Sequence, residues 1–319
     1  MTVRLRHDVA EQDSMSPDAR WTCAFVNNMP DGAFDATERQ FLGLLDAGSG
    51  DDVLEVRCFT MSGVPRGERI AARIDEAYSP LTGIYVDPPD LLLVTGSNPI
   101  ETDIRDELYW DDLVELLTWS RKQVPTTVLS CLSAHAALTL FDGIERVRLP
   151  AKCAGVFPQD VDVTHPLARG IDRDILLPHS RQNSVWREAM IDAGYDIVVQ
   201  SEDVGWGVAS REEEGRQLVL VQGHPEYDRS SLLREYHRDV ARYVHHERDD
   251  LPILPFHCAA PADWAVLEES HHAIINGQRD AGLVDTYPFD EVGERAPWPW
   301  QETAQRFYAN VLANMTESD

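Results

Sequence analysis

The sequence contains very little lysine. Only Lys122 and Lys152 are lysines among 28 basic residues, which face 55 Asp and Glu residues. The formal net charge of −27 argues against a protein that coats nucleic acid, because neutralising phosphates requires a basic surface. It is typical of a chain whose copies repel one another in solution. The hydrophobic content of 43% is that of a folded protein and excludes disorder for most of the chain, and no nucleic-acid partner is expected.

Long apolar runs and cysteine pairs are also missing. No run approaches the ~18 apolar residues of a membrane helix, so no membrane partner is expected. The polar segment 1–20 lacks the apolar core of a signal peptide. The five cysteines include no Cys-x-x-Cys pair, which predicts neither a disulfide framework nor a metal site. We therefore expect a reduced, cytoplasmic protein.

Short apolar runs alternate with helical patterns along the chain. Several runs are continuously apolar, which is typical of strands buried on both faces of a parallel sheet. This alternation predicts an α/β fold with a doubly wound, mostly parallel sheet in a single domain, 21–319. Residues 248–299 are expected to form an irregular insertion, a long C-terminal excursion before a terminal helix at 301–315. The strand candidates are 23–28, 53–60, 90–96, 126–130, 195–201, 207–210 and 218–223, and the other helix candidates are 37–47, 106–122, 133–141 and 230–247.

Cys131 stands between a strand candidate and a helix candidate. A tight turn there would expose the thiol at the carboxyl edge of the sheet, where the helix N-terminus favours a thiolate. The backbone N–H of Leu132 would contribute to an oxyanion hole. His135, one turn further along the same helix, cannot easily reach back over the thiol and is expected to be structural. The local pattern alone leaves open that Cys131 is a small buried hydrophobic residue.

Two further loops follow strand candidates. In Gln222-Gly-His-Pro-Glu-Tyr-Asp228, His224 is a candidate general base for Cys131, and Glu226 is a candidate to orient its imidazole. A capping histidine in a turn is the alternative, but the pairing with a cysteine elbow is more specific. The loop after Gly96 predicts a second N–H donor for an oxyanion at Ser97, although glycine after a strand is often only a turn.

These loops and other short stretches resemble the homoserine O-succinyltransferase/O-acetyltransferase family of methionine biosynthesis. That family has the class I glutamine amidotransferase-like fold with a Cys…His-x-Glu triad. The resemblance runs from about residue 22 to 256, with a weaker echo in the terminal helix. The matching stretches include 27–30, 40–45, 94–96, 109–110, 119–120, 152–156, 178–181, 223–228 and 238–239.

The resemblance implies an acyl-CoA-dependent O-acyltransferase that acylates the hydroxyl of L-homoserine. Cys131 would carry the acyl group as a thioester in a ping-pong mechanism, with acyl-CoA as co-substrate and no permanently bound cofactor. The implied substrates are small molecules, and the resemblance is also compatible with a homodimer. Because CoA is a polyanion, we expect cations to gather locally in an otherwise negative protein. The residues placed near the substrate are Lys152, Ser180, Arg181 and Arg238.

The chain departs from the family where the acyl group is selected. In the family a glycine in the loop after Gly96 goes with succinyl and a glutamate with acetyl; here Ile100 stands at that position with Glu101 beside it. A bulky or acidic residue should exclude a succinyl carboxylate, which favours acetyl-CoA. The alternatives are the same chemistry on L-serine or another hydroxy amino acid, a glutamine amidotransferase-like hydrolase, and a binding protein that kept the fold.

Overall fold

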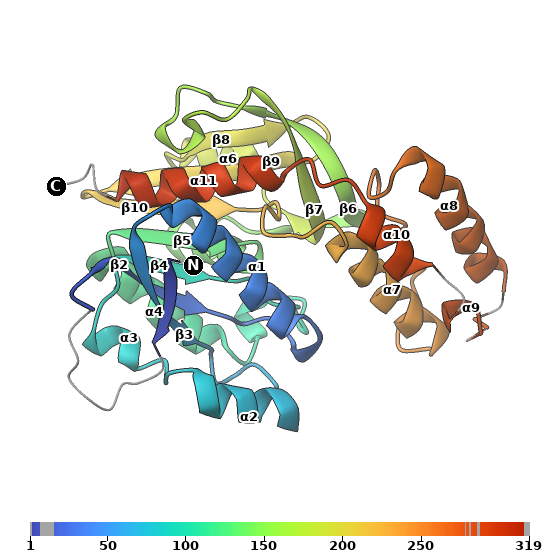
Figure 1. Ribbon diagram of the computed structural model, residues 1–319, viewed down its shortest axis with the longest axis horizontal. Helices are drawn as coiled ribbons and strands as arrows, with labels where there is room; N and C mark the ends of the chain where they lie inside the picture. The colour runs from blue at the N-terminus through green and yellow to red at the C-terminus, as the bar shows by residue number, and fades with distance from the viewer. Residues whose placement is uncertain (1, 7–15, 278, 281, 286–287, 316–319) are drawn as a thin grey trace.

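The computed structural model describes residues 2–6, 16–277, 279–280, 282–285 and 288–315 (Figure 1). Its centre is a ten-stranded sheet in the order β1-β3-β2-β4-β5-β10-β9-β8-β6-β7. The first six strands in this order run parallel, and the remaining ones pair antiparallel. The parallel strands are β1 (Val3–Arg6), β3 (Val53–Phe59), β2 (Ala19–Val26), β4 (Leu91–Val94), β5 (Thr126–Ser130) and β10 (Arg216–Val221). The predicted α/β sheet is therefore confirmed.

The antiparallel part contains two of the strands that the sequence patterns missed. Its members are β9 (Gly205–Glu213), β8 (Asp196–Ser201), β6 (Val147–Val161) and β7 (Asp174–Ser184). The strands β8 and β9 were predicted, but β6 and β7 were not. The first half of β6 is largely exposed and polar, so it carries neither the apolar run nor the strict alternation by which a strand is recognised. This long hairpin carries Lys152, Ser180 and Arg181.

Helices cover both faces of the sheet. One core contains side chains of α1 (Asp31–Ser49) and α11 (Gln301–Asn314), and the other contains side chains of α4 (Trp110–Gln123) and α5 (Leu132–Asp142). Figure 1 shows α11 running beside α1, although they lie at opposite ends of the sequence. The shorter helices are α2 (Glu68–Ala77), α3 (Gly83–Val86) and α6 (Arg187–Asp192). None of the described helices is long and apolar enough to cross a membrane.

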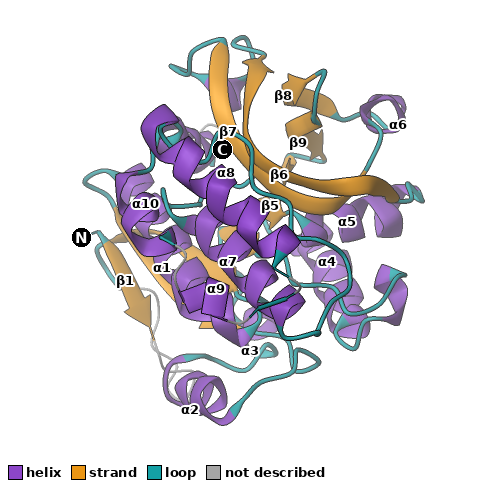
Figure 2. Cartoon of the chain, turned by 90° about the vertical axis from the view of Figure 1, so that its right-hand side faces the viewer, coloured by secondary structure: helices purple, strands orange, loops and turns teal. Residues whose placement is uncertain are grey.

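The C-terminal excursion is helical rather than irregular. Residues 248–299 contain α8 (Pro261–Asn276), α9 (Gly282–Asp285) and α10 (Phe289–Arg295), which group with α7 (Ser231–Val244) on one side of the sheet (Figure 2). They share a separate apolar core with α7. These helices were not predicted because the segment is rich in Asp, Pro and His. Pro261, however, lies at the start of α8, where proline is well tolerated. Residues 278, 281 and 286–287 of this segment lie outside the described residues.

The polar N-terminal segment contributes a strand of its own. Residues 3–6 form β1, which pairs in parallel with β3 at the edge of the sheet. Asp46 of α1 anchors this strand by accepting hydrogen bonds from the backbone N–H groups of Thr2 and Val3, at 2.6 and 3.0 Å. The segment 1–20 is therefore partly integrated into the domain, while residues 1 and 7–15 lie outside the described part.

Candidate active site

Cys131 occupies a strained turn between β5 and α5. Its backbone has φ 51° and ψ −104°, whereas Ser130 ends the strand and Leu132 begins the helix. Non-glycine residues held at such angles cost about 1–3 kcal/mol and persist only where the surrounding structure imposes them. Here the Cys131 N–H donates to the Val221 carbonyl at 2.6 Å, and the Cys131 carbonyl accepts from His135 N–H at 3.1 Å. The turn has the form of a nucleophile elbow and leaves the thiol partly exposed.

The loop after β4 lies directly against this elbow. A Cβ atom added at Gly96 would stand 3.4 Å from both the Leu132 nitrogen and the Cys131 Cβ. The backbone at Gly96 thus packs in van der Waals contact with the turn. The half-buried Ser97 follows, so the two residues expected to form the oxyanion hole lie on facing segments beside the thiol.

His224 and Glu226 complete a Cys-His-Glu arrangement. The His224 Nδ1 lies 2.7 Å from a Glu226 carboxylate oxygen, and each residue is only 7% exposed. The other ring nitrogen, Nε2, is buried and has no hydrogen-bond partner, while the imidazole interacts electrostatically with the Cys131 side chain. Burial alone would lower the pKa of His224, but the charge of Glu226, the hydrogen bond to it and the nearby Cys131 side chain outweigh burial and raise that pKa well above 6.5. An imidazole in this position can exchange a proton with Cys131 or with a substrate bound there.

Glu235 is the main residue of the site that the sequence analysis missed. Its carboxylate accepts hydrogen bonds from the Ser180 and Tyr227 hydroxyls and lies 3.3 Å from the Lys152 Nζ. Burial raises the pKa of Glu235, yet the charges of Lys152 and Arg238 with these hydrogen bonds bring it below its ordinary value. One signal could have found it: Glu235 lies three residues before Arg238 on α7, which places both on one helix face.

The expected basic pocket is instead a mixed network of ion pairs. Asp239 lies 2.9 Å from Lys152 and 3.0 Å from Arg238, and Arg248 approaches it at 3.3 Å. Asp239 and Glu235 together neutralise Lys152 and Arg238, the cations that were expected to form the pocket. The pocket is neutral because α7 carries both acidic and basic side chains at this position. Lys152, Ser180 and Arg238 are brought together as expected, but without a net positive charge.

Two arginines near Cys131 have unpartnered guanidinium atoms. Arg181 is 6% exposed and donates to the Val204 carbonyl, while its Nε and Nη1 have no hydrogen-bond partner. Burial lowers the pKa of Arg181, and the Cys153 and Cys131 side chains act against that. Arg146, which the sequence analysis did not single out, also has a buried Nη1 without a partner and interacts electrostatically with Cys131.

Ile100 and Glu101 do not fill the space beside the thiol. The Ile100 side chain is 70% exposed, and Glu101 is exposed as well. Their backbone N–H groups both donate to one carboxylate oxygen of Glu107, at 2.7 and 2.9 Å. This contact fixes the loop and directs both side chains to solvent, so a steric exclusion of a larger acyl group by Ile100 finds no support in the packing.

His135 has the structural role expected for it. Its Nε2 lies 2.9 Å from the Gln222 side-chain oxygen, and burial lowers its pKa to about 4. His179 is likewise fully buried, with Nε2 2.6 Å from the Gln159 side-chain nitrogen. Neither histidine competes with His224 as the base for Cys131.

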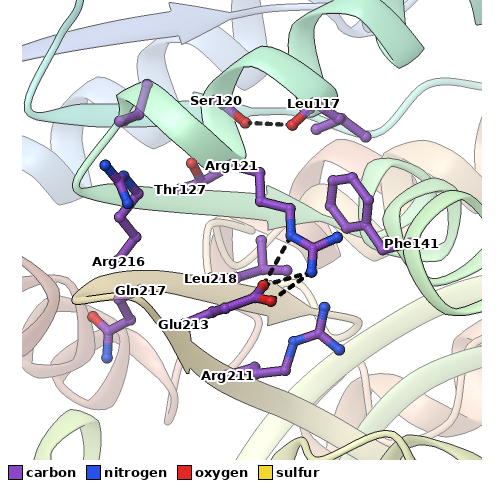
Figure 3. A pocket seen from close by; sticks show the side chains of 11 residues that line it. Leu117, Ser120, Arg121, Thr127, Phe141, Arg211, Glu213, Arg216, Gln217 and Leu218 are labelled. Atoms are coloured by element: carbon purple, nitrogen blue, oxygen red, sulfur yellow. Dashed lines mark hydrogen bonds and ion pairs between the residues drawn. The ribbon is translucent and has the colours of Figure 1, made fainter.

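A separate pocket lies near the amino ends of β5 and β10, at the edge of the sheet opposite Cys131 (Figure 3). An ion pair of 2.7 Å between Arg121 and Glu213 crosses it, and Thr127 and Gln217 contribute polar atoms. Its lining contains no cysteine or histidine. Cys131 and His224, by contrast, follow the carboxyl ends of β5 and β10, at the edge where α/β proteins place their sites.

Known proteins resemble this chain along nearly its whole length. A family model described as Homoserine O-succinyltransferase matches residues 5–318. The homoserine O-succinyltransferase of Rhodopseudomonas palustris is 35% identical over 290 residues, covering 91% of this chain and 86% of the relative. That of Bradyrhizobium japonicum is 40% identical over 272 residues, covering 84% and 82%.

A solved structure of low sequence identity resembles this chain at the level of the fold. The crystal structure of SMU.1228c superposes with a TM-score of 0.51 at 11% identity, covering 92% of this chain and 99% of that one. A glutamine amidotransferase from Thermotoga maritima gives a TM-score of 0.47 at 11% identity, covering 93% and 98%.

Proposed function

Because the chain belongs to the homoserine O-succinyltransferase family and is a homoserine O-acyltransferase, we propose that it works through a thioester on Cys131. The observation that carries this proposal is the strained elbow at Cys131, whose thiol faces a His224–Glu226 pair joined at 2.7 Å. Such a turn costs about 1–3 kcal/mol and persists where the surrounding structure imposes it, and a turn that exposes a nucleophile is one such case. The fold is the class I glutamine amidotransferase-like fold expected from the sequence.

In the first half-reaction the Cys131 thiolate attacks the carbonyl carbon of an acyl-CoA. The sulfur–carbon bond forms, the CoA sulfur leaves with the bonding electrons, and His224 supplies the proton that it needs. The negative oxygen of the tetrahedral intermediate is stabilised by backbone N–H groups at Leu132 and Ser97. Arg181, with two unpartnered nitrogen atoms, adds a positive charge on the same side.

In the second half-reaction the hydroxyl of L-homoserine attacks the thioester. His224, now neutral, accepts the hydroxyl proton, and the ester forms as Cys131 leaves as a thiolate. The acceptor is a zwitterion, so its site requires both signs of charge. We assign its ammonium group to Glu235 and its carboxylate to Arg238 and Lys152, whose network is neutral in the free protein.

For the acyl donor we propose succinyl-CoA. The relatives carry that activity in their names. The sequence-based preference for acetyl-CoA rested on Ile100 and Glu101, and Ile100 turns to solvent. L-Serine in place of L-homoserine would use the same residues, and hydrolysis would result if water reached the thioester in place of the acceptor.

A thiol-release assay tests the proposal. The full chain is mixed with succinyl-CoA or acetyl-CoA and with L-homoserine, L-serine or no acceptor, while free CoA is measured. We expect release that depends on homoserine, and a mass increase on Cys131 when the acceptor is omitted. Cys131→Ala removes both, whereas Cys58→Ala, a buried cysteine of β3, retains them. Full turnover by Cys131→Ala, or release that ignores the acceptor, would refute the mechanism.

A further inference from the structure

Two polar groups beside the elbow have no hydrogen-bond partner. One is the Arg146 Nη1, a buried atom of a half-buried side chain. The other is the hydroxyl of Tyr109, a residue only 4% exposed, beside which Ser97 lies without forming a bond of standard geometry. A buried donor without an acceptor costs about 1–3 kcal/mol. Because the two residues also interact electrostatically, one ligand group could satisfy both donors.

The loop between Gly96 and Tyr109 brings both groups to the thiol. It begins at Gly96, against the Cys131 Cβ, and is tied to the segment after α5 at two points. The Arg146 Nη2 donates to the Thr102 carbonyl at 3.0 Å, and Arg105 forms an ion pair of 2.9 Å with Glu145. The guanidinium interacts electrostatically with Tyr109, with the carboxylates of Glu107 and Asp103, and with Cys131. The second nitrogen, Nη1, is thus held in place and left unused.

We propose that Arg146 and Tyr109 bind the distal carboxylate of the succinyl group carried by Cys131. This inference rests on the proposed function and deepens it by naming the residues that select the acyl group. A guanidinium and a phenol are donors that match the two oxygens of one carboxylate. Burial raises the pKa of Tyr109, which keeps its hydroxyl protonated as a donor. An acetyl group has no atom that would satisfy either donor.

Arg181 is the competing cation, and its position assigns it elsewhere. It lies on β7, and its guanidinium donates to the Val204 carbonyl in the loop between β8 and β9. Arg146 instead donates to the Thr102 carbonyl, in the loop that carries Ser97. We therefore assign Arg181 to the tetrahedral oxyanion and Arg146 to the succinyl carboxylate.

The test compares two donors on the intact protein. We measure kcat/KM for succinyl-CoA and for acetyl-CoA, with saturating L-homoserine, in Arg146→Met, Arg146→Lys and Tyr109→Phe. Losing a hydrogen bond to a charged group predicts a fall of about 10- to 100-fold for succinyl-CoA in Arg146→Met. Acetyl-CoA, which makes no such contact, should lose much less. Arg146→Lys keeps the charge and should recover part of the loss, and Tyr109→Phe should show a smaller effect in the same direction.

Two further variants serve as controls. Arg216→Met removes an arginine at the opposite edge of the sheet and should not change the ratio of the two donors. Arg181→Met should impair both donors alike. Equal losses on both donors in Arg146→Met, or a selective loss of succinyl-CoA in Arg181→Met, would overturn the inference, as would a wild-type preference for acetyl-CoA. If no donor supports turnover in the wild type, the proposed function itself fails, which is a distinct result.

Discussion

The strain at Cys131 predicts an unusual order of stability between two inactive variants. Cys131→Ala keeps a Cβ atom at φ 51°, whereas Cys131→Gly removes it. Release of the backbone strain should stabilise the glycine variant by about 1–3 kcal/mol, and the extra freedom of glycine in the unfolded chain opposes this by about 0.4–1 kcal/mol. We therefore expect Cys131→Gly to be more stable than Cys131→Ala by about 0.5–2 kcal/mol.

Urea unfolding monitored by the fluorescence of the eight tryptophans measures this difference. A matched control is Ala72→Gly, at an exposed position within α2, where the same change should destabilise by about 0.5–1 kcal/mol. The two sites thus predict opposite signs for the same pair of residues. An alanine variant at position 131 as stable as the glycine variant, or more so, would show that the turn is not strained.

Three further outcomes follow from the same contacts. Glu226→Gln removes the charge that raises the pKa of His224, so less imidazolium remains at neutral pH, and the pH profile of Cys131 alkylation by iodoacetamide should move to higher pH; an unchanged profile contradicts the pairing. Glu235→Gln should raise the KM for L-homoserine about tenfold or more while the KM for acyl-CoA changes little; equal changes would place Glu235 elsewhere. Trp298 and Trp300 both donate to the Tyr227 carbonyl, at 3.0 and 2.8 Å. Exchanging both for Phe should lower kcat by more than the single changes combined, because only the double variant leaves that carbonyl unpaired; additive effects would contradict this.

The Cys-His-Glu arrangement could be predicted because its members follow strands that are neighbours in the sheet. The residues Cys131 and His224 come after β5 and β10, which pair in parallel, so their loops meet at the same edge. Glu226 then lies two residues from the histidine that it orients. The succession of strand, Cys131 and helix is a local pattern, and the structure contains it as β5, Cys131 and α5.

The residues that we propose to bind the substrates were harder to predict, because their arrangement depends on how distant elements pack. Glu235 meets Ser180 only because α7 lies across the β6–β7 hairpin, and the sequence patterns revealed neither β6 nor β7. The unpaired atoms of Arg146 and Tyr109 are visible only once every neighbour is placed. Ile100 illustrates the reverse case: it aligns with a selective position, yet the contact with Glu107 turns its side chain outward.

The net negative charge of the chain would repel the anionic groups of the proposed substrates, and the charges that offset this repulsion lie inside the site. A basic pocket of Lys152 and Arg238 would suit a carboxylate but would repel the ammonium group of an amino acid. The neutral network with Glu235 and Asp239 complements both ends of a zwitterion, and it keeps the cations extended and in place before the acceptor arrives. Arg181 has two nitrogens without a hydrogen-bond partner and lies near Cys131, so its charge is available to the anionic intermediate that we propose there. A protein with a net charge of −27 can therefore offer a local positive charge to an anionic substrate.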